Sequence, residues 1–593
     1  MTPKNTNFNV NTIKRIRIWY GLLILIVSIF VIRLFYVQVL KYSEYKNAAL
    51  SDQLKVYQIT PTRGVIEAQD GNQVVPLVLN QTAYTLYADP SFIKNPKSIA
   101  SKITSVIGGD PNTYASEMVT SGTQYVILAK KITQSQSDKI LSYKIPGLGT
   151  QGQDYRTYPE GSLASQLLGF VNNDGTGEYG IEQALNNQLA GSPGQVKAIT
   201  DANGVPLAAT KGNVEKAPQN GKNEVLTINL GMQAQLEQIL ANEYKKTNSQ
   251  GLSAVIINPK NGQIAAMANY PTYDPSNYAS VTNPLLYQNA AVTNAIEPGS
   301  SMKTLTTSAA LDQGVIQPDT SFYDPAHWVV DGFNITDIEQ DGGARQQNIA
   351  NILALSLNTG AVWMLMQMGG GQINQKGIDA WHNYMVNHFR LGRITGVEQG
   401  YESAGYVPQA QSDTADPSVD LTYANTSFGQ GVQLTALQLA AAESSILNGG
   451  TYYKPTLISQ TVSPNGQVST NQPVVEEKNV VNPKVGQEML PLMENVVTHY
   501  ASEGFTYMNF PSQYMVGGKT GTAQIASPTG GYDPNQYNGT YVGFVGGNNV
   551  QYVIVVYNTK PNVPGYAGSY GGQPVFGDLA HMLINEGYVS PKS

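Results

Sequence analysis

The chain has 593 residues, of which 41% are hydrophobic and only 13% are charged, and its formal net charge is -7. Such a length predicts at least two globular domains, and so weak a charge provides no basic surface for nucleic acid. Cysteine is absent, which excludes disulfides and cysteine catalysis, and the five histidines lack the spacing of a helical metal site. We therefore expect no metal, no cofactor and no nucleic-acid partner.

Residues 18–40 predict a single transmembrane helix. They are almost entirely apolar, and as a helix they could cross roughly 30 Å of hydrocarbon. The preceding residues 1–17 carry basic but no acidic side chains, so the positive-inside rule predicts a cytoplasmic tail there and an extracytoplasmic position for everything after residue 40. A cleaved signal peptide is the competing interpretation, but the apolar run is long for one and no small-residue cleavage site follows it.

Two segments with different sequence patterns follow the apolar segment. Residues 41–222 contain short strand-like stretches between Gly, Asn and Pro turns, with a few helical segments, and predict an extended β-rich pedestal. Residues 223–593 begin with a strand, a helix and a hairpin around the turn 259–262, and strand signals return late, after a long helical middle. Strands at both ends with helices between them predict one α/β domain whose sheet is completed by its termini.

Ser300 and Lys303 form the first candidate catalytic pair. They lie in the sequence EPGSSMK at 297–303, in which the Pro-Gly pair predicts a turn and the residues after it predict a helix. Residues three apart share a helix face, so the Lys303 amine can reach the Ser300 hydroxyl at the helix N-terminus. A lysine is a competent base only if burial or a second cation lowers its pKa, so we expect Lys303 to be partly desolvated. The same spacing at 43–46 and 91–94 lacks the turn, and we interpret it as coincidence.

Ser356 and Asn358 form the second candidate element. They lie in the sequence LALSLNTG at 353–360, whose apolar flanks predict that both polar side chains are buried and need partners. The two residues could simply satisfy a loop. Alternatively, the serine could relay a proton and the asparagine could bind a substrate amide. Taken alone, the motif leaves both readings open.

The third element is the sequence GGKTGTA at 517–523, which lies in a late strand pattern and does not follow a Gly-x-x-x-x-Gly loop. A phosphate-binding loop is therefore disfavoured. Glycines in a strand let a ligand approach closely, and a lysine with two hydroxyls can receive a carboxylate. The structural alternative is an edge-strand bulge with a solvated lysine. The candidate substrate-binding residues here are Lys519, Thr520, Gly521 and Thr522.

Ser-x-x-Lys, Ser-x-Asn and Lys-Thr-Gly occur in this order, which is the signature set of serine acyl-transferases that react with penicillin. The chain resembles a class B penicillin-binding protein of the division type over essentially its whole length. Further sequences resemble blocks of that family, four in the pedestal and two in the catalytic domain. They are RGVIE at 63–67, RTYP at 156–159, LGFV at 168–171, GIE at 180–182, AMANYP at 266–271 and FGQG at 428–431.

The resemblance implies the fold and the domain order. Residues 223–593 should form a transpeptidase domain of the penicillin-binding/β-lactamase-like α/β fold, with a central antiparallel sheet flanked by helices. Residues 41–222 should form a non-catalytic pedestal or dimerisation domain. The protein should lie in the bacterial cytoplasmic membrane as a single-pass protein, with its catalytic domain outside.

The resemblance also implies roles for the candidate residues. Ser300 would attack the penultimate D-alanine carbonyl of a peptidoglycan stem peptide, Lys303 would take its proton, and Ser356 would relay that proton to the departing D-alanine. Asn358 would hold the donor amide, and the Lys-Thr-Gly strand would bind the terminal carboxylate. The backbone N–H groups of Ser300 and Thr522 would form the oxyanion hole.

Implied partners are β-lactams, a polytopic membrane glycan polymerase and other division or elongation proteins. A β-lactamase or a β-lactam sensor would share the three motifs but would not be expected to carry such a pedestal. A catalytically silent scaffold of a wall-synthesis complex is the third hypothesis, and the intact motifs argue against silence. The sequence 420–431 favours a division role.

Overall fold

The computed structural model describes residues 10–46, 54–71, 73–199, 214–337, 343–411, 418–527 and 530–593. Contacts divide the chain into two compact units. One comprises Met1–Pro61 and Gly191–Gln219, and the other comprises Thr62–Ala190 and Asn220–Ser593. The second unit thus joins most of the predicted pedestal to the whole predicted catalytic domain, and the boundary after residue 222 stays a prediction.

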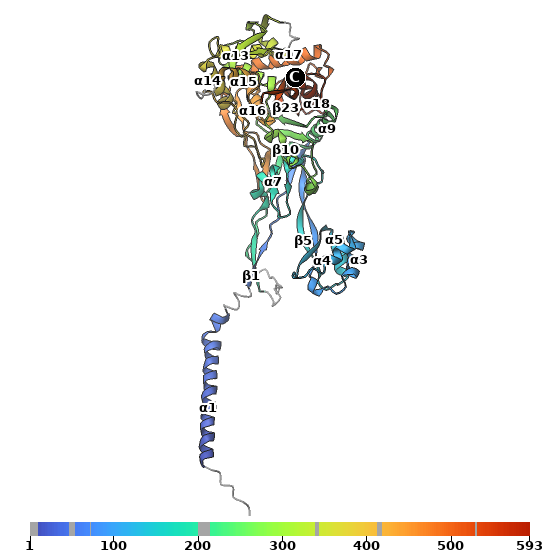
Figure 1. Ribbon diagram of the computed structural model, residues 1–593, viewed down its shortest axis with the longest axis vertical. Helices are drawn as coiled ribbons and strands as arrows, with labels where there is room; N and C mark the ends of the chain where they lie inside the picture. The colour runs from blue at the N-terminus through green and yellow to red at the C-terminus, as the bar shows by residue number, and fades with distance from the viewer. Residues whose placement is uncertain are drawn as a thin grey trace, which may run out of the picture. The chain divides into compact units, whose positions relative to one another are not determined.

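The first unit contains the apolar helix and a small sheet. Helix α1, Val10–Phe35, continues into the π-helical turn η1, Tyr36–Leu40 (Figure 1). Among the described residues, one helix is long and apolar enough to cross a membrane, over Ile13–Leu40, which fits a single-pass anchor. The helix begins earlier than the expected residue 18. Three strands pair in the order β1-β8-β9; they are β1 Leu54–Ile59, β8 Gly194–Ile199 and β9 Val214–Lys216.

One sheet of seven strands runs through the pedestal and into the catalytic region. Its order is β19-β18-β10-β2-β3-β4, and β5 pairs with β3. Strand β10 lies parallel to β2 of the pedestal and antiparallel to β18 of the catalytic region. The strands are β2 Ile66–Asp70, β3 Gln73–Ala88, β4 Val126–Ile132, β5 Leu148–Thr157, β10 Asn223–Asn229, β18 Ile458–Val462 and β19 Val468–Thr470.

A small helical layer covers the far end of this sheet. Figure 1 shows α3, α4 and α5 gathered beside one end of β5. Their apolar side chains form a separate core with those of β3 and β4, and that core includes Leu86, Ile103, Leu128 and Ile140. The helices are α3 Pro96–Ile107, α4 Pro111–Glu117 and α5 Gln134–Ser142.

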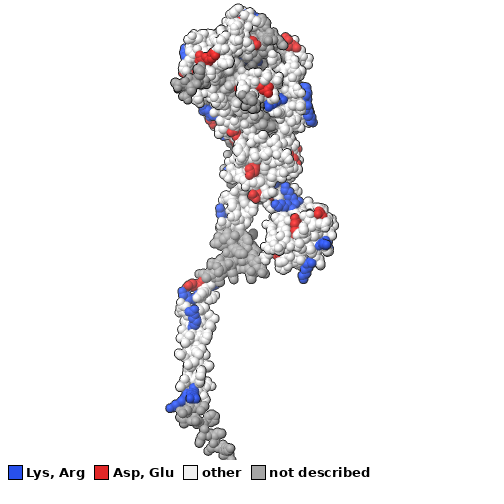
Figure 2. All heavy atoms as spheres, viewed as in Figure 1, with Lys and Arg blue, Asp and Glu red and all other residues white. Residues whose placement is uncertain are grey.

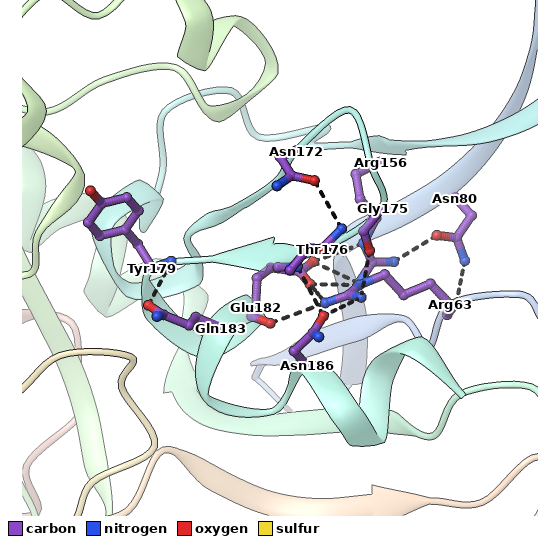
Figure 3. A network of polar contacts seen from close by, with 11 residues as sticks. Arg63, Asn80, Arg156, Asn172, Gly175, Thr176, Tyr179, Glu182, Gln183 and Asn186 are labelled. Carbon is purple, nitrogen blue, oxygen red and sulfur yellow. Dashed lines mark hydrogen bonds and ion pairs between the residues drawn. The ribbon is translucent and has the colours of Figure 1, made fainter. Parts of the chain in front are cut away.

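A buried ion network joins three of the pedestal sequences that resemble the family (Figure 3). Glu182 is fully buried and accepts hydrogen bonds from Arg63 Nε at 2.8 Å and from Arg156 Nε at 2.8 Å, one on each carboxylate oxygen. Arg156 also donates to Asn80 Oδ1 at 2.8 Å, and Arg63 donates to Asn186 Oδ1 at 2.9 Å. Two guanidinium groups therefore share a single carboxylate. The short elements here are α6 Ser165–Leu168, β6 Phe170–Val171, β7 Gly177–Glu178, α7 Gly180–Ala184 and α8 Asn186–Ala190.

The catalytic region is built on a five-stranded antiparallel sheet of order β12-β11-β23-β22-β21. The first two strands form the predicted hairpin, and the last three come from the C-terminal part, so the sheet is completed by both ends of the region as expected. This arrangement confirms the predicted fold class. The strands are β11 Gly251–Ile257, β12 Ile264–Tyr270, β21 Met515–Ala526, β22 Tyr532–Gly546 and β23 Val550–Thr559.

Helices cover both faces of this sheet because its strands are apolar on both sides. Val255 and Ile257 pack into the core that contains α11 and α16, whereas Ala254 and Ile256 pack into the core of α9 and α18. Side chains of a strand alternate between faces, so one hairpin strand serves both cores. The four helices are α9 Leu230–Thr247, α11 Met302–Asp312, α16 Ala436–Leu447 and α18 Gln573–Asn585.

The remaining elements surround this framework. The helical segments are η2 Pro90–Phe92, η4 Pro275–Ser280, η5 Pro284–Tyr287, α10 Ala290–Thr293, η6 Gly299–Ser301, α12 Ile349–Ala354, α13 Asn358–Met368, α14 Gln375–Asn383, η8 Tyr384–His388, α15 Val419–Thr426, α17 Pro483–Ser502, η9 Thr506–Met508 and η10 Gly568–Gly572. The short strands are β13 Ser321–Asp324, β14 His327–Val330, β15 Phe333–Thr336, β16 Arg345–Asn348, β17 Thr451–Tyr453 and β20 Val475–Lys478. Figure 2 shows that the visible surface is mostly uncharged, in keeping with the composition.

Replacing Glu182 by alanine should destabilise the protein strongly. The change leaves the Arg63 and Arg156 guanidinium groups buried without their shared carboxylate, and breaking a buried ion pair in this way typically costs about 3–5 kcal/mol. Urea unfolding of the purified protein, followed by circular dichroism, measures the loss. The matched control is Glu160→Ala at an exposed position, which should change stability by less than about 0.5 kcal/mol. Equal stability of the two variants would contradict a structural role for the network.

Candidate active site

Ser300 stands on a tight turn at the start of a buried helix. Gly299 has φ +56°, and the 3-10 turn η6 that contains Ser300 leads directly into α11, as the sequence predicted. The turn is held by a hydrogen bond from Gly299 N to Gly429 O at 3.0 Å. Gly429 has φ +88°, and a Cβ there would lie 2.0 Å from the Gly299 carbonyl oxygen. The FGQG sequence thus supports the serine turn through backbone contact that only glycine permits.

Lys303 lies at the centre of the site. It has no exposed surface, and its Nζ donates to Ser300 Oγ at 2.8 Å, which brings the predicted pair together. The same amine donates to Asn358 Oδ1 at 2.8 Å and to the Ser356 carbonyl oxygen at 2.6 Å. Ser356 Oγ is also within reach at 3.3 Å. The first two sequence motifs therefore meet at one nitrogen atom, and the expected desolvation of the lysine is complete.

Ser356 and Asn358 lie at the turn between α12 and α13. Ser356 adopts φ +61°, a left-handed conformation that is uncommon for a residue with a side chain. This conformation directs both its carbonyl oxygen and its hydroxyl toward Lys303. Asn358 is held from the other side, because its Nδ2 donates to Thr336 O at 3.0 Å. The strained serine and the clamped asparagine form a fixed receptor, which argues against an ordinary loop.

The Lys-Thr-Gly motif lies on β21 beside the other two. Lys519 has no exposed surface, and its Nζ donates to Ser356 Oγ at 3.0 Å and to Thr520 O at 3.0 Å. The Ser356 hydroxyl is therefore within hydrogen-bonding distance of both buried lysines. The interpretation of this motif as a bulge with a solvated lysine is wrong, since Lys519 is buried and β21 pairs continuously with β22 from Met515 to Gln524.

The two threonines of this strand are also held in place. Thr520 Oγ1 lies 3.1 Å from Tyr500 Oη, and Thr522 Oγ1 accepts a hydrogen bond from Gly568 N at 2.9 Å. Between them, Gly521 packs so closely that a Cβ would lie 2.1 Å from Thr540 Oγ1. A Cβ at Gly521 would also lie 2.3 Å from Pro298 O, so the glycine lets the strand lie against the serine turn. The Thr522 hydroxyl, which accepts from Gly568 N, keeps its proton available for an anion.

A cleft of about 490 Å³ opens over these residues. Its lining includes Ser300, Ser356, Asn358 and both threonines, so the predicted hydroxyl groups face one space. The sequence motifs gave no signal for the rest of the wall, which is rich in aromatic side chains from α17, β22 and the segment before α18. Those additional residues are His499, Tyr500, Glu503, Phe505, Gln524, Tyr537, Tyr566, Ser569 and Tyr570. Phe428 and Gln430 of the lining belong to the FGQG sequence, and Ala354 and Leu355 belong to the stretch that contains Ser356.

Two carboxyl groups near the site, one half-buried and one fully buried, were also missed by the sequence analysis. Asp337 accepts hydrogen bonds from Thr359 N at 3.0 Å and from Thr359 Oγ1 at 2.6 Å, and so caps α13 behind Asn358. Burial raises the pKa of Asp337, and the Thr359 hydrogen bonds and the Lys303 charge oppose that rise. Glu443 of α16 is fully buried behind α11, and burial raises its pKa to about 7. No local motif marks either residue as close to Ser300.

Within the described ranges, no group of three or more His, Cys, Asp or Glu side chains could hold a metal ion. What the site offers is two serine hydroxyls, two buried amines, an amide and two threonine hydroxyls. A hydroxyl in contact with a buried amine is suited to nucleophilic attack, and the lysine with its threonines is suited to a carboxylate. The arrangement is therefore that of an acyl-transfer site.

The sequence matches two families in tandem. Residues 252–581 match the penicillin binding protein transpeptidase domain, and residues 58–226 match the penicillin-binding protein dimerisation domain. Among curated relatives, Stage V sporulation protein D of Bacillus subtilis is 28% identical over 98% of this chain and 87% of its own length. Peptidoglycan D,D-transpeptidase FtsI of Escherichia coli K12 is 24% identical over 99% of this chain and 95% of its own length. The chain therefore belongs to the class B penicillin-binding proteins, of the division type.

Solved structures share the fold. Penicillin Binding Protein 2X from Streptococcus thermophilus superposes with a TM-score of 0.72 at 24% identity, covering 90% of this chain and 80% of that chain. Penicillin binding protein 3 from Mycobacterium tuberculosis, complexed with aztreonam, gives a TM-score of 0.67 at 24% identity, covering 91% and 98%. These likenesses agree with the predicted α/β fold.

Replacing Glu443 by glutamine should stabilise the protein in a pH-dependent way. The folded-state pKa of about 7 exceeds the ordinary value of 4.5. The protonated carboxyl therefore contributes fully to folding stability only below pH 4.5, and that contribution is lost as the pH rises to about 7. Glutamine cannot ionise. The melting temperature of Glu443→Gln minus that of the native protein should therefore increase between pH 4.5 and about 7. Above that pH the difference should stay level.

Thermal unfolding across this pH range is the measurement. The control variant is Glu586→Gln, since Glu586 is exposed, and its difference from the native protein should not change with pH in this way. A constant margin for Glu443→Gln at all pH values would show that Glu443 does not take up a proton on folding.

Proposed function

We propose that the chain is a serine-type peptidoglycan D,D-transpeptidase, which cross-links stem peptides with release of D-alanine and is acylated by β-lactams. The observation that carries this proposal is the hydrogen bond between the buried Lys303 amine and Ser300 Oγ, within reach of Ser356 and Asn358. The family membership and the similarity to the peptidoglycan D,D-transpeptidase FtsI support the same reaction.

In the first step, Ser300 Oγ attacks the carbonyl carbon of the penultimate D-alanine while Lys303 accepts its proton. Lys303 is fully buried and its Nζ lies 2.8 Å from Ser300 Oγ, so the amine in its uncharged form is in position to act as the base. The new bond joins Oγ to the carbonyl carbon, and the carbonyl oxygen becomes an oxyanion. The N–H groups of Ser300 and Thr522 stabilise it, since the serine turn lies against β21, where a Cβ on Gly299 would come within 2.6 Å of Thr522 O.

In the second step, the C–N bond breaks and D-alanine leaves as the acyl-enzyme forms. The proton passes from Lys303 through the Ser356 hydroxyl to the departing nitrogen, because Ser356 Oγ lies 3.3 Å from Lys303 Nζ. Lys519, Thr520 and Thr522 hold the terminal carboxylate during this step, and Asn358 positions the donor amide. An amine of a second stem then attacks the ester carbonyl and forms the new C–N bond. The C–O bond to Ser300 breaks, and a proton from the amine returns to Ser300 Oγ.

The proposed location follows from the same membership. The helix Ile13–Leu40 anchors the protein in the bacterial cytoplasmic membrane. The basic residues among residues 1–17, at and before the start of this helix, favour a cytoplasmic N-terminus and a catalytic region outside, where peptidoglycan lies. Its protein partners are a polytopic membrane glycan polymerase and other division proteins.

Replacing Ser300 by alanine should abolish covalent labelling by a fluorescent penicillin. Replacing Lys303 by methionine, which keeps the length of the side chain but removes the amine, should slow acylation by about 10²–10⁴-fold. Intact-mass spectrometry with peptide mapping measures both effects. The control is Lys484→Met, because Lys484 is a largely exposed lysine on α17 and should acylate at the native rate.

The same experiment separates the competing functions. A stable adduct on Ser300 supports a transpeptidase, whereas an adduct that is lost rapidly by hydrolysis would point to a β-lactamase. Continued labelling of the Ser300→Ala protein would overturn the assignment of the nucleophile. Failure of the native protein to form any adduct would favour the scaffold hypothesis.

A further inference from the structure

A second and larger hollow adjoins the catalytic cleft. It has a volume of about 1260 Å³ and lies where β11 begins and where β12 and β23 end. Its walls come from the segments 283–294, 534–537 and 559–567, together with the C-terminal end of α9. Pockets for small molecules usually measure about 300–1,000 Å³, so this hollow has room for a segment of a polymer. We call it the polar groove.

The polar groove and the catalytic cleft share one wall. Tyr537 of β22 lines both hollows. In the segment after β23, Gly565 and Ala567 line the polar groove, whereas Tyr566 and Ser569 line the cleft. A ligand whose reactive end lies at Ser300 could therefore extend past Tyr537 into the groove.

The lining of the polar groove is almost free of charge. Among the described residues that line it, Lys560 alone carries a charge, and no carboxylate is present. Instead, its walls present side-chain amides, each of which offers two donors and an acceptor. Six of these amides make no hydrogen bond with another described residue, so their capacity is available to a ligand. They are the side chains of Asn248, Gln250, Gln288, Asn294, Gln536 and Asn562.

Aromatic rings complete the lining. Tyr244 and Tyr270 lie side by side in the wall, with ring centroids 4.8 Å apart. The Tyr537 ring is fixed at the shared wall, because its hydroxyl donates to Pro534 O at 2.9 Å. Phenol rings combine an apolar face with a polar edge. Neutral amides beside such rings suit a ligand that is dense in hydroxyl and acetamido groups and has apolar C–H faces.

We propose that the polar groove binds the N-acetylated glycan backbone of the peptidoglycan strand whose stem enters the catalytic cleft. This inference rests on the proposed transpeptidase function. Stem peptides carry carboxylate and ammonium groups, which a wall with a single charge cannot pair. The glycan is neutral, because the carboxylate of its lactyl group is consumed in the amide bond to the stem. Charge therefore assigns the stem to the cleft and the sugars to the groove.

Calorimetric titration of the full-length protein in detergent micelles tests this assignment, with N-acetylated glycan strands that lack stem peptides and whose lactyl carboxyl groups are capped as neutral amides. The variant is the double substitution Gln288→Met and Gln536→Met, which removes two free amides from two separate segments of the lining at nearly constant side-chain length. Losing two hydrogen bonds should weaken glycan binding by about tenfold or more. Gln472→Met is the control, since Gln472 is exposed and lies outside the groove, and it should bind as the native protein does.

Acylation by fluorescent penicillin is measured in parallel, and all three proteins should react at the same rate because penicillin occupies only the cleft. Native acylation with no glycan binding, or with binding that the double variant leaves unchanged, would overturn the groove assignment. A sugar-free stem peptide that displaces the glycan would also overturn it, since the groove would then be a peptide site. If the native protein is not acylated by penicillin but still binds glycan, and the double variant weakens that binding, the transpeptidase proposal fails and the groove assignment stands.

Discussion

The amine of Lys303 is held out of water, and the rest of the catalytic region depends on how it is satisfied. A buried amine without partners is costly, so the fold must deliver acceptors to it. One partner, Ser300, lies just before the helix that carries Lys303. The other two, Ser356 and Asn358, lie where α12 ends and α13 begins. Lys519 joins from the C-terminal strand through the Ser356 hydroxyl. Three segments that are far apart in the sequence thus become one site, because Ser356 contacts both buried lysines and Lys303 also contacts Ser300.

Much of this site could be predicted because its residues occur in short motifs with local geometry. The spacing of Ser300 and Lys303 on one helix face and the placement of Lys519 in a strand follow from sequence alone, and the structure joins all of them through hydrogen bonds to Ser300 and Ser356. The left-handed backbone at Ser356 could not be predicted, since nothing in an apolar run of residues marks it. The roles assigned to these residues remain predictions.

The parts that escaped prediction depend on contacts between distant segments. Asp337 reaches Thr359 across 22 residues, and Glu443 reaches Thr304 across 139. Neither pair has a local pattern that would indicate it. In the pedestal, the resemblance pointed to separate sequence blocks, but it did not predict that Arg63, Arg156 and Glu182 meet at one carboxylate. In each region, one buried ionisable side chain forms hydrogen bonds with residues from several segments: Glu182 in the pedestal and Lys303 in the catalytic region.

The seven-stranded sheet has a consequence for any attempt to separate the two domains. Strand β10 pairs with pedestal strand β2 on one side and with β18 on the other. A fragment that starts at residue 223 would keep β18 and lose β2, and one side of β10 would then present unsatisfied N–H and C=O groups. Such a bare edge is a template for pairing with another molecule. The isolated catalytic fragment should therefore be prone to self-association, and solubility would require the Thr62–Ala190 segment to be supplied in cis or as a co-expressed partner chain.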